Sequence, residues 1–169
     1  MKELVLIRHA KSSWKDTSLN DFDRPLNKRG KNDAPKMAKF LRKMIVNSPD
    51  LIISSPSKRT KLTLDFFLKE FDLEKSKDDN IIFEESIYEA PYTNLLKVIK
   101  NINENKNIVF LFGHNPGLND LTNYLIGNFK ENISTSGILK INFDINLWSE
   151  IEENSGKLEF FKYPKILDI

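Results

Sequence analysis

The stretch LVLIRHAKSSW at residues 4–14 decides the fold that we expect for this chain. Its first four residues are apolar and mostly branched, which is typical of a short strand buried on both faces of a parallel sheet. Arg8 and His9 follow at once, where such a strand would emerge at its carboxyl end. Ligands of open parallel sheets bind just beyond these ends, so the two residues are placed for chemistry.

Three later apolar runs, at residues 51–53, 81–83 and 108–112, predict further strands. The run at 108–112 is the most continuously apolar, which favours a central position. Amphipathic segments separate these runs, and they predict helices. Strands that alternate with helices indicate a three-layer α/β fold, with a mostly parallel sheet and helices on both faces.

The starts and ends of the helices have recognisable signals. Asn27 is the predicted N-cap of a helix that runs to about residue 47, and Ser57 is that of a helix to about residue 71. A third helix is expected from Thr93. Asn115 as N-cap, with Pro116 at the first helical position, predicts a fourth helix that ends at Gly127.

The last forty residues differ from the rest of the chain. Strands are expected at 138–143 and 157–163, with a turn signal at 154–156 between them. Lys140 and Asn142 suggest partial exposure of the first of these strands, which favours an antiparallel edge over a central position. The chain has no internal repeat, low-complexity segment or linker, so residues 1–169 are predicted to form a single domain.

Composition excludes several classes of function. The chain has 26 basic and 24 acidic residues among 169, a net charge of +2, and no large block of one sign, so nothing indicates a nucleic-acid or membrane partner. The absence of cysteine excludes disulfides, thiolate chemistry and cysteine-based zinc sites. The start of the chain lacks a signal-peptide pattern, and no run approaches the roughly 18 apolar residues of a membrane span, so we expect a cytoplasmic protein.

Three of the expected loops bring basic side chains to the carboxyl edge of the sheet. They carry Arg8 with His9, then Arg59, then His114, and these are the only two histidines in the chain. Arg59 lies in the first turn of its helix, where its charge opposes the helix dipole unless an anion offsets it. The alternative to a shared site is that the two histidines lie in unrelated loops. Metal binding fits poorly because two histidines without nearby acidic ligands are too few.

Phosphoryl transfer accounts for the whole set. The transferred group carries negative charge on three oxygens, so it needs positive donors around it and a nucleophile in line. Guanidinium groups supply permanently charged, forked donors. A neutral imidazole can be the nucleophile and form a phosphohistidine intermediate, and nearby arginines favour its neutral form.

These motifs together resemble the histidine phosphatase superfamily, and in particular the small phosphohistidine phosphatases of the SixA type. Residues 6–10 are similar to the Arg-His-Gly signature, with Ala10 where glycine is usual, and residues 54–60 and 113–116 are similar to two later motifs. Asp23-Arg24-Pro25-Leu26, with Gly30, matches a further piece, and the likeness runs from residue 4 to about 145. The resemblance implies a phosphoglycerate-mutase-like fold and no metal or organic cofactor.

The resemblance also assigns roles to particular residues. It implies that His9 is the nucleophile and that Arg8, Arg59 and His114 form the phosphate pocket. We also expect Arg24 and Ser12 to bind substrate.

The general acid is less well marked. Glu89 is the nearest candidate, although its motif does not match the usual one, and a solvent-facing glutamate is the alternative.

The predicted function is therefore a metal-independent phosphatase that removes phosphate from phosphohistidine, on a protein. The short connections leave no evident lid domain, so a protein-bound phosphate could enter. A phosphatase of a small phosphate ester is the first alternative. A non-catalytic phosphate-binding module is the second, although binding alone needs no in-line nucleophile.

Overall fold

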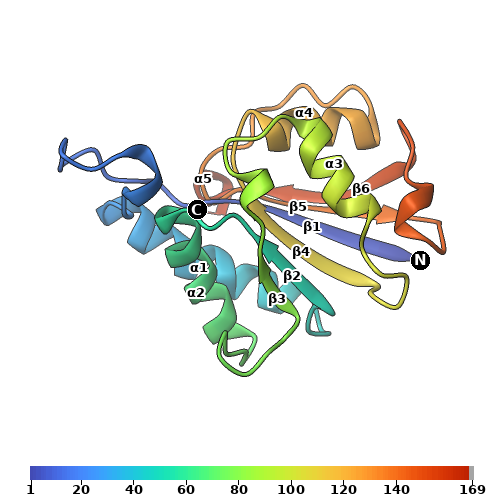
Figure 1. The fold of residues 1–169 in the computed structure, drawn as a ribbon, viewed down its shortest axis with the longest axis horizontal. Helices are drawn as coiled ribbons and strands as arrows, with labels where there is room; N and C mark the ends of the chain where they lie inside the picture. Colours follow the sequence, from blue (N-terminus) through green and yellow to red (C-terminus); the bar gives the residue numbers. More distant parts are fainter. Residues whose placement is uncertain (168–169) are drawn as a thin grey trace.

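The computed structural model describes residues 1–167, and a six-stranded sheet runs through their centre in the order β3-β2-β4-β1-β5-β6 (Figure 1). The four strands from β3 to β1 are parallel, and β5 and β6 are antiparallel to their neighbours. This confirms the predicted mostly parallel sheet with an antiparallel edge. The strands are β1 (Lys2–Arg8), β2 (Leu51–Ser54), β3 (Ile81–Phe83), β4 (Ile108–Gly113), β5 (Ile138–Phe143) and β6 (Gly156–Lys162).

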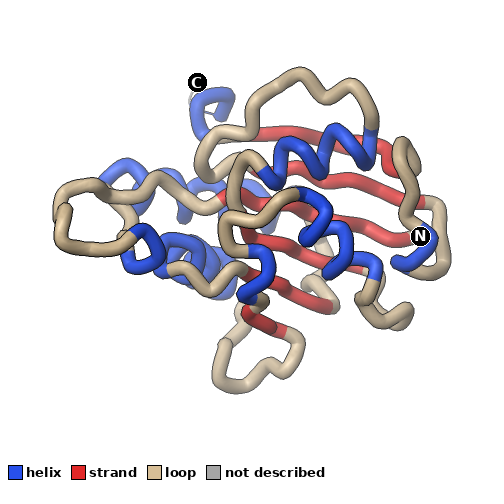
Figure 2. The backbone as a smooth tube through the Cα atoms, turned by 45° about the horizontal axis from the view of Figure 1, so that its top comes forward, coloured by secondary structure: helices blue, strands red, loops and turns tan. Residues whose placement is uncertain are grey.

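Helices cover both faces of the sheet, as the alternating pattern predicted. α1 (Lys28–Met44) and α2 (Lys58–Glu70) lie on one face, and α3 (Tyr92–Lys100) and α4 (Gly117–Ile126) lie on the other (Figures 1 and 2). A short α5 (Pro164–Leu167) lies beside α1. Among residues 1–167, no helix is both long enough and apolar enough to cross a membrane.

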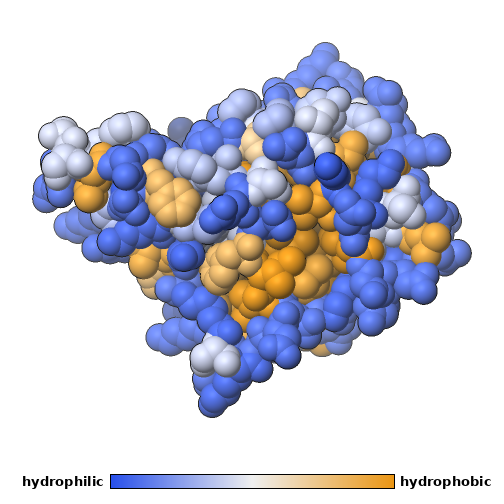
Figure 3. Space-filling view, in the orientation of Figure 1, coloured by the Kyte–Doolittle hydropathy of each residue, from blue (hydrophilic) through white to orange (hydrophobic). Residues whose placement is uncertain are grey.

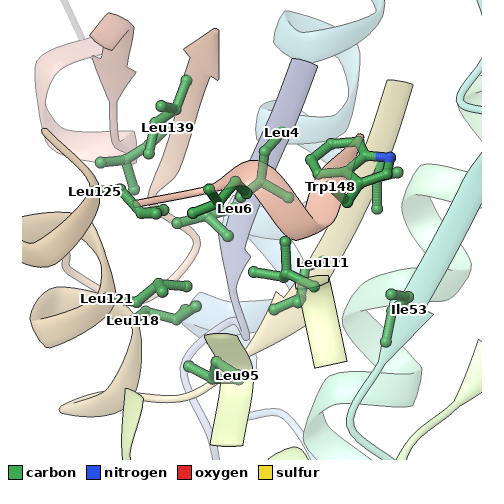
Figure 4. Packing of buried hydrophobic residues seen from close by; sticks show 14 of the residues in the cluster. Leu4, Leu6, Ile53, Leu95, Leu111, Leu118, Leu121, Leu125, Leu139 and Trp148 are labelled. Atoms are coloured by element: carbon green, nitrogen blue, oxygen red, sulfur yellow. The ribbon is translucent and has the colours of Figure 1, made fainter. Parts of the chain in front are cut away.

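The central strands bury side chains on both of their faces. Alternate side chains of a strand point to opposite faces, so Leu4 and Leu6 pack under α3 and α4, while Val5 and Ile7 pack under α1 and α2. Figure 4 shows the first of these two cores, with Leu4, Leu6 and Leu111 on the strands facing leucines of the helices. Fully burying such a side chain stabilises the fold by roughly 1.5–3 kcal/mol. The continuous apolar runs are therefore explained by burial on two faces.

The expectation that the strand at 138–143 lies at an edge of the sheet is wrong. β5 lies inside the sheet between β1 and β6, and β6 is the outermost strand. The Lys140 ammonium lies 2.7 Å from Glu3 Oε1 on β1 and 2.9 Å from Glu159 Oε2 on β6. Its charge is thus paired on both neighbouring strands, which is why a lysine is tolerated at an interior strand.

The predicted helix starts hold for α1 and differ for α4. Asn27 caps α1, because its side chain accepts a hydrogen bond from the Gly30 amide at 2.8 Å. The prediction of Asn115 as N-cap is wrong: α4 begins at Gly117, and the Asn115 side chain accepts from the Asn119 amide. Gly127 ends α4 with a positive φ of 73°, as expected.

Gly30 lets α1 approach the loop that follows His9. A Cβ atom on Gly30 would lie 2.2 Å from the carbonyl oxygen of Lys11, which is a backbone atom and cannot swing away. The Asn27 amide donates to that same carbonyl at 2.9 Å. The start of α1 therefore supports the backbone two residues beyond His9.

Replacing Gly30 with alanine is expected to destabilise the protein by ~1–3 kcal/mol, the usual cost of overpacking. This is the opposite of the ~1 kcal/mol gain that alanine normally gives over glycine inside a helix. Urea unfolding of Gly30→Ala measures the change, and Lys31→Ala, at an exposed position of the same helix, is the matched control. A stabilised Gly30→Ala would contradict the close approach to Lys11.

Candidate active site

The carboxyl ends of β1, β2 and β4 meet at one edge of the sheet and bring the predicted residues together. Arg8 pairs in register with Gly113, so the residues that follow, His9 and His114, lie side by side with ring centroids 5.1 Å apart. The Ser55 amide donates to the Phe112 carbonyl at 3.0 Å, which places the start of α2 beside them. The parallel pairing alone thus assembles three loops into one site.

A backbone hydrogen bond determines which nitrogen of His9 faces the site. Its Nδ1 lies 2.8 Å from the carbonyl oxygen of Ala10, and a carbonyl can only accept, so Nδ1 carries the proton. Nε2 is left as an unprotonated acceptor, 3.4 Å from Nε of Arg59. Burial lowers the pKa of His9 well below 6.5, despite the Ala10 bond, and the nearby His114, Arg59 and Arg8 lower it further. His9 is therefore a neutral imidazole with its lone pair turned into the site.

The backbone around His9 is held from α2. The Ala10 amide donates to Oγ1 of Thr63 at 2.9 Å, and this hydroxyl donates to the Arg59 carbonyl at 2.8 Å. Ala10 is completely buried beside Leu26. The methyl group that distinguishes Ala10 from glycine is thus accommodated in a small apolar cluster.

Arg59 is the most deeply buried cation of the site, with its side chain 2% exposed. Its Nη1 donates to the Asp21 carbonyl at 2.8 Å, and its Nη2 donates to Asp21 Oδ2 at 3.1 Å and to Glu89 Oε1 at 2.7 Å. A buried charge is costly unless it is paired. The anion expected beside the start of this helix is thus supplied here by two carboxylates of the chain.

Arg8 approaches the site from β1. Its Nη1 donates to the Ile133 carbonyl at 2.8 Å. Its Nε is buried, and within residues 1–167 no acceptor lies against it. Burial lowers the pKa of Arg8, while Glu89 opposes this shift and Arg59 adds to it. Arg8 therefore has one buried N–H without a hydrogen-bond partner in the described part of the chain.

His114 is a second neutral imidazole. Its Nε2 lies 2.7 Å from Oγ of Ser55, and its Nδ1 lies 3.4 Å from Arg59 Nη2 and 3.6 Å from Glu89 Oε1. Burial lowers the pKa of His114 to about 3, Arg59 adds to the shift, and Asp21 opposes it. Nδ1 is the nitrogen that faces the charged groups of the site.

Glu89 lies at the rim of the site with its side chain 46% exposed. Its carboxylate contacts both Arg59 and His114, and its backbone φ is +50°. Glu89 is thus partly solvent-facing, as the alternative interpretation held, and also in direct contact with the predicted pocket.

Arg24 and Ser12 are connected to these residues through Asp21. Arg24 donates from Nη1 to Ser12 Oγ at 2.8 Å and from Nη2 to Asp21 Oδ1 at 2.9 Å, and its guanidinium stacks on the Trp14 ring at 3.5 Å. Arg24 and Arg59 are connected through Asp21, which both of them contact. The structure therefore ties Arg24 and Ser12 to the loop that carries Asp21.

Sequence reasoning missed Asp21, Tyr88 and Ser55. The Tyr88 hydroxyl donates to Asp21 Oδ2. Burial raises the pKa of Asp21, but hydrogen bonds from Tyr88 and Arg24 and the charge of Arg59 outweigh it and lower that pKa to about 2. Burial and the bond to Asp21 raise the pKa of Tyr88 to about 12. Asp21 lies in an irregular loop where no periodic pattern could mark it, although it is adjacent to the quoted motif at 23–26.

Within residues 1–167, no three histidine or acidic side chains lie close enough together to hold a metal ion. What the site offers is a neutral imidazole with an available lone pair, flanked by two guanidiniums and a second imidazole. Such an arrangement can bind a compact anion and attack its central atom.

Comparison with known proteins agrees with this chemistry. The profile of the histidine phosphatase superfamily (branch 1) matches residues 4–82. The chain is 51% identical over 63 residues to an uncharacterised chloroplastic protein of Arabidopsis thaliana, and 38% identical over 84 residues to phosphoserine phosphatase 1 of Hydrogenobacter thermophilus. These matches cover 37% and 48% of this chain, but only 28% and 38% of the two curated relatives.

A solved structure matches over nearly the whole length. It is that of a candidate phosphohistidine phosphatase, SixA, of Agrobacterium tumefaciens, with a TM-score of 0.81 and 26% sequence identity. The match covers 96% of this chain and 98% of the other. The likeness therefore extends past residue 82 to the part of the chain that holds Glu89 and His114.

The two histidines predict how stability depends on pH. Their pKa values lie below 6.5 in the fold, His114 at about 3, whereas an unfolded histidine titrates near 6.5. Below about pH 6.5 the unfolded chain therefore binds more protons, so stability is complete above that pH and falls as the pH is lowered. Each histidine contributes a slope of up to ~1.4 kcal/mol per pH unit.

Urea unfolding between pH 6 and 4.5 measures this slope. The unfolding free energy of His114→Gln is expected to depend less steeply on pH than that of the wild type, by an amount that corresponds to about one proton. His9→Gln is the matched second variant. Asp21, with a pKa of about 2, contributes only at lower pH. Equal slopes in the wild type and both variants would contradict the buried, neutral state of the histidines.

Proposed function

We propose that this chain, which belongs to the histidine phosphatase superfamily, is a metal-independent phosphatase. It transfers a phosphoryl group first to His9 and then to water, and its substrate is phosphohistidine on a protein. The observation that carries this proposal is the unprotonated Nε2 of His9, held toward Arg59 by the bond from Nδ1 to the Ala10 carbonyl. A group that only bound phosphate would need no such lone pair.

In the first step, Nε2 of His9 attacks phosphorus. The Nε2–P bond forms as the P–N bond to the substrate imidazole breaks. A substrate ring that already carries a proton on its other nitrogen leaves as a neutral imidazole. The low pKa of His9 keeps it neutral and therefore nucleophilic. As positive charge develops on the ring, the Ala10 carbonyl that accepts from Nδ1 stabilises it.

Arg8 and Arg59 neutralise the oxygens of the transferred group. The N–H groups of Arg59 that now contact Asp21 and Glu89 point into the site, and a phosphate dianion competes for them with a higher charge. The buried Nε of Arg8 has no other acceptor within the described part of the chain. Two planar guanidiniums suit the geometry of phosphate oxygens better than lysines would.

A bound phosphate changes the protonation of His114. A phosphate next to its Nδ1 raises the pKa of this imidazole, because an opposite charge favours the protonated form. Nδ1 then donates to a phosphate oxygen, while Nε2 stays bonded to Ser55. In the second step, water attacks phosphorus, the Nε2–P bond of His9 breaks, and inorganic phosphate leaves.

The choice of substrate rests on the leaving group and on access to the site. The imidazole of a phosphohistidine can leave already protonated, so it requires little help from an acid. The carboxylates of Asp21 and Glu89 at the rim are about half exposed, so a phosphate carried on a protein surface can reach them. The similarity to a candidate phosphohistidine phosphatase points the same way.

A small phosphate ester is the second candidate substrate. An alkoxide is a poor leaving group and needs a positioned acid. Glu89, 3.6 Å from His114 and 2.7 Å from Arg59, is in place for that role. The partial likeness to a phosphoserine phosphatase also favours this alternative.

We expect His9 to become phosphorylated during turnover. Rapid quenching with labelled substrate should trap an adduct that is labile in acid, stable in base and located on His9 by mass spectrometry. His9→Ala should form no adduct, and chelation of divalent ions should leave turnover unchanged. Near-normal turnover by His9→Ala would overturn the assignment of the nucleophile.

Glu89→Gln should separate the two substrate classes. General acid catalysis is typically worth 10²–10⁴-fold, so hydrolysis of any ester should slow by about that factor. Hydrolysis of a phosphohistidine should stay within about tenfold of the wild type, because its leaving group needs less protonation. Turnover of both substrate types by both proteins measures the difference.

The neighbouring Glu85→Gln is the matched control, because Glu85 lies on the same exposed segment and should affect neither substrate. Equal, large losses on both substrates would make Glu89 a general acid for both and remove it as the basis of discrimination.

A further inference from the structure

A hollow of about 640 Å³ lies between α3 and the outer strands β2 and β3, apart from the phosphoryl site. Figure 3 shows hydrophobic side chains gathered in this hollow, bordered by hydrophilic ones. Its size is within the range of small-molecule sites in proteins. The apolar lining is formed by Leu51, Ile53, Ile82, Val98 and Ile102.

The hollow exists because α3 and α4 leave the β3 edge of the sheet uncovered on their face. α3 and α4 pack on each other, and their core lies over β1, β4 and β5 (Figures 1 and 2). β3 is the edge strand, and Ile82 on it remains 39% exposed, directly opposite Ile53 of β2 in the register. Ile82 and the partly buried Leu51, Val98 and Ile102 thus leave aliphatic surface accessible on a face that is otherwise core.

The lining has a distinctive chemistry. Every apolar residue is aliphatic, so nothing in it offers a ring to stack on a base or an aromatic group. Two lysines, Lys97 and Lys106, stand at its rim against a single carboxylate, Glu84. Glu84 already accepts a hydrogen bond from Ser86 at 2.9 Å. The hollow therefore combines an aliphatic floor with a net positive rim.

We propose that this hollow binds a monomeric straight-chain carboxylate, such as a medium-chain fatty acid anion. The aliphatic chain would be buried between α3 and the two strands, and the carboxylate would be held by Lys97 and Lys106. A thin, flexible chain suits an aliphatic hollow without aromatic walls, and the charge of the rim selects an anionic head. This proposal does not depend on the phosphatase activity of the other site.

Calorimetric titration with octanoate tests the proposal, at concentrations where it stays monomeric. Octan-1-ol and octyltrimethylammonium are the neutral and cationic comparisons, and octanoate should bind more tightly than either. Hexanoate, octanoate and decanoate should bind with increasing affinity, by up to about fourfold for each added methylene group. No detectable octanoate binding, or equal binding of the cationic analogue, would overturn the proposal.

Two pairs of variants locate the site. Ile82→Asp places a carboxylate in the hollow and should abolish octanoate binding. Phe83→Asp is its matched control, because Phe83 is similarly exposed on the same strand but lies against Lys61 of α2 on the opposite face. Equal losses in these two variants would contradict the site.

The double variant Lys97→Gln, Lys106→Gln should weaken octanoate by about tenfold and leave octan-1-ol unchanged, as expected for two exposed ion pairs. Lys100→Gln, on the same helix but outside the hollow, should change neither. A protein that binds fatty-acid-loaded phosphatidylcholine vesicles but not free octanoate would have a membrane-docking surface here instead, which would also overturn the proposal.

Discussion

The hydrogen bond from Nδ1 of His9 to the carbonyl of Ala10 is the interaction on which the site depends. It decides which ring nitrogen is protonated, and so which one faces Arg59. The same short loop is held by Thr63 of α2 and, two residues further on, by the start of α1 at Gly30. The orientation of one imidazole is thus maintained by two helices on the same face of the sheet.

Burial keeps both imidazoles of the site neutral. Both imidazoles have pKa values below 6.5, and burial is the largest cause in each. The guanidinium of Arg59, by contrast, carries a permanent charge, and Asp21 and Glu89 offset the cost of burying it. The protein therefore places neutral nitrogen and permanent positive charge within hydrogen-bonding distance, and burial keeps the nitrogen neutral at a pH where an exposed histidine would be protonated.

The parts of the fold that follow from local pattern could be predicted from the sequence, and the parts that depend on pairing through space could not. The apolar run at 4–7 and the cap at Asn27 carry their own signals. Lys140 looked like an exposed strand residue because its partners are on neighbouring strands, 137 and 19 residues away along the chain. Asp21 reaches Arg59 from an irregular loop, and only the folded chain shows that contact.

The protonation of His9 is the most direct test of the account, and nitrogen-15 NMR of the imidazoles can observe it. The chain has only two histidines, so comparison with His114→Gln assigns the signals. We predict that at pH 7 His9 is neutral, with a protonated Nδ1 and a nitrogen-15 chemical shift for Nε2 that is typical of an unprotonated nitrogen. A protonated Nε2, in either the other tautomer or an imidazolium, would contradict it.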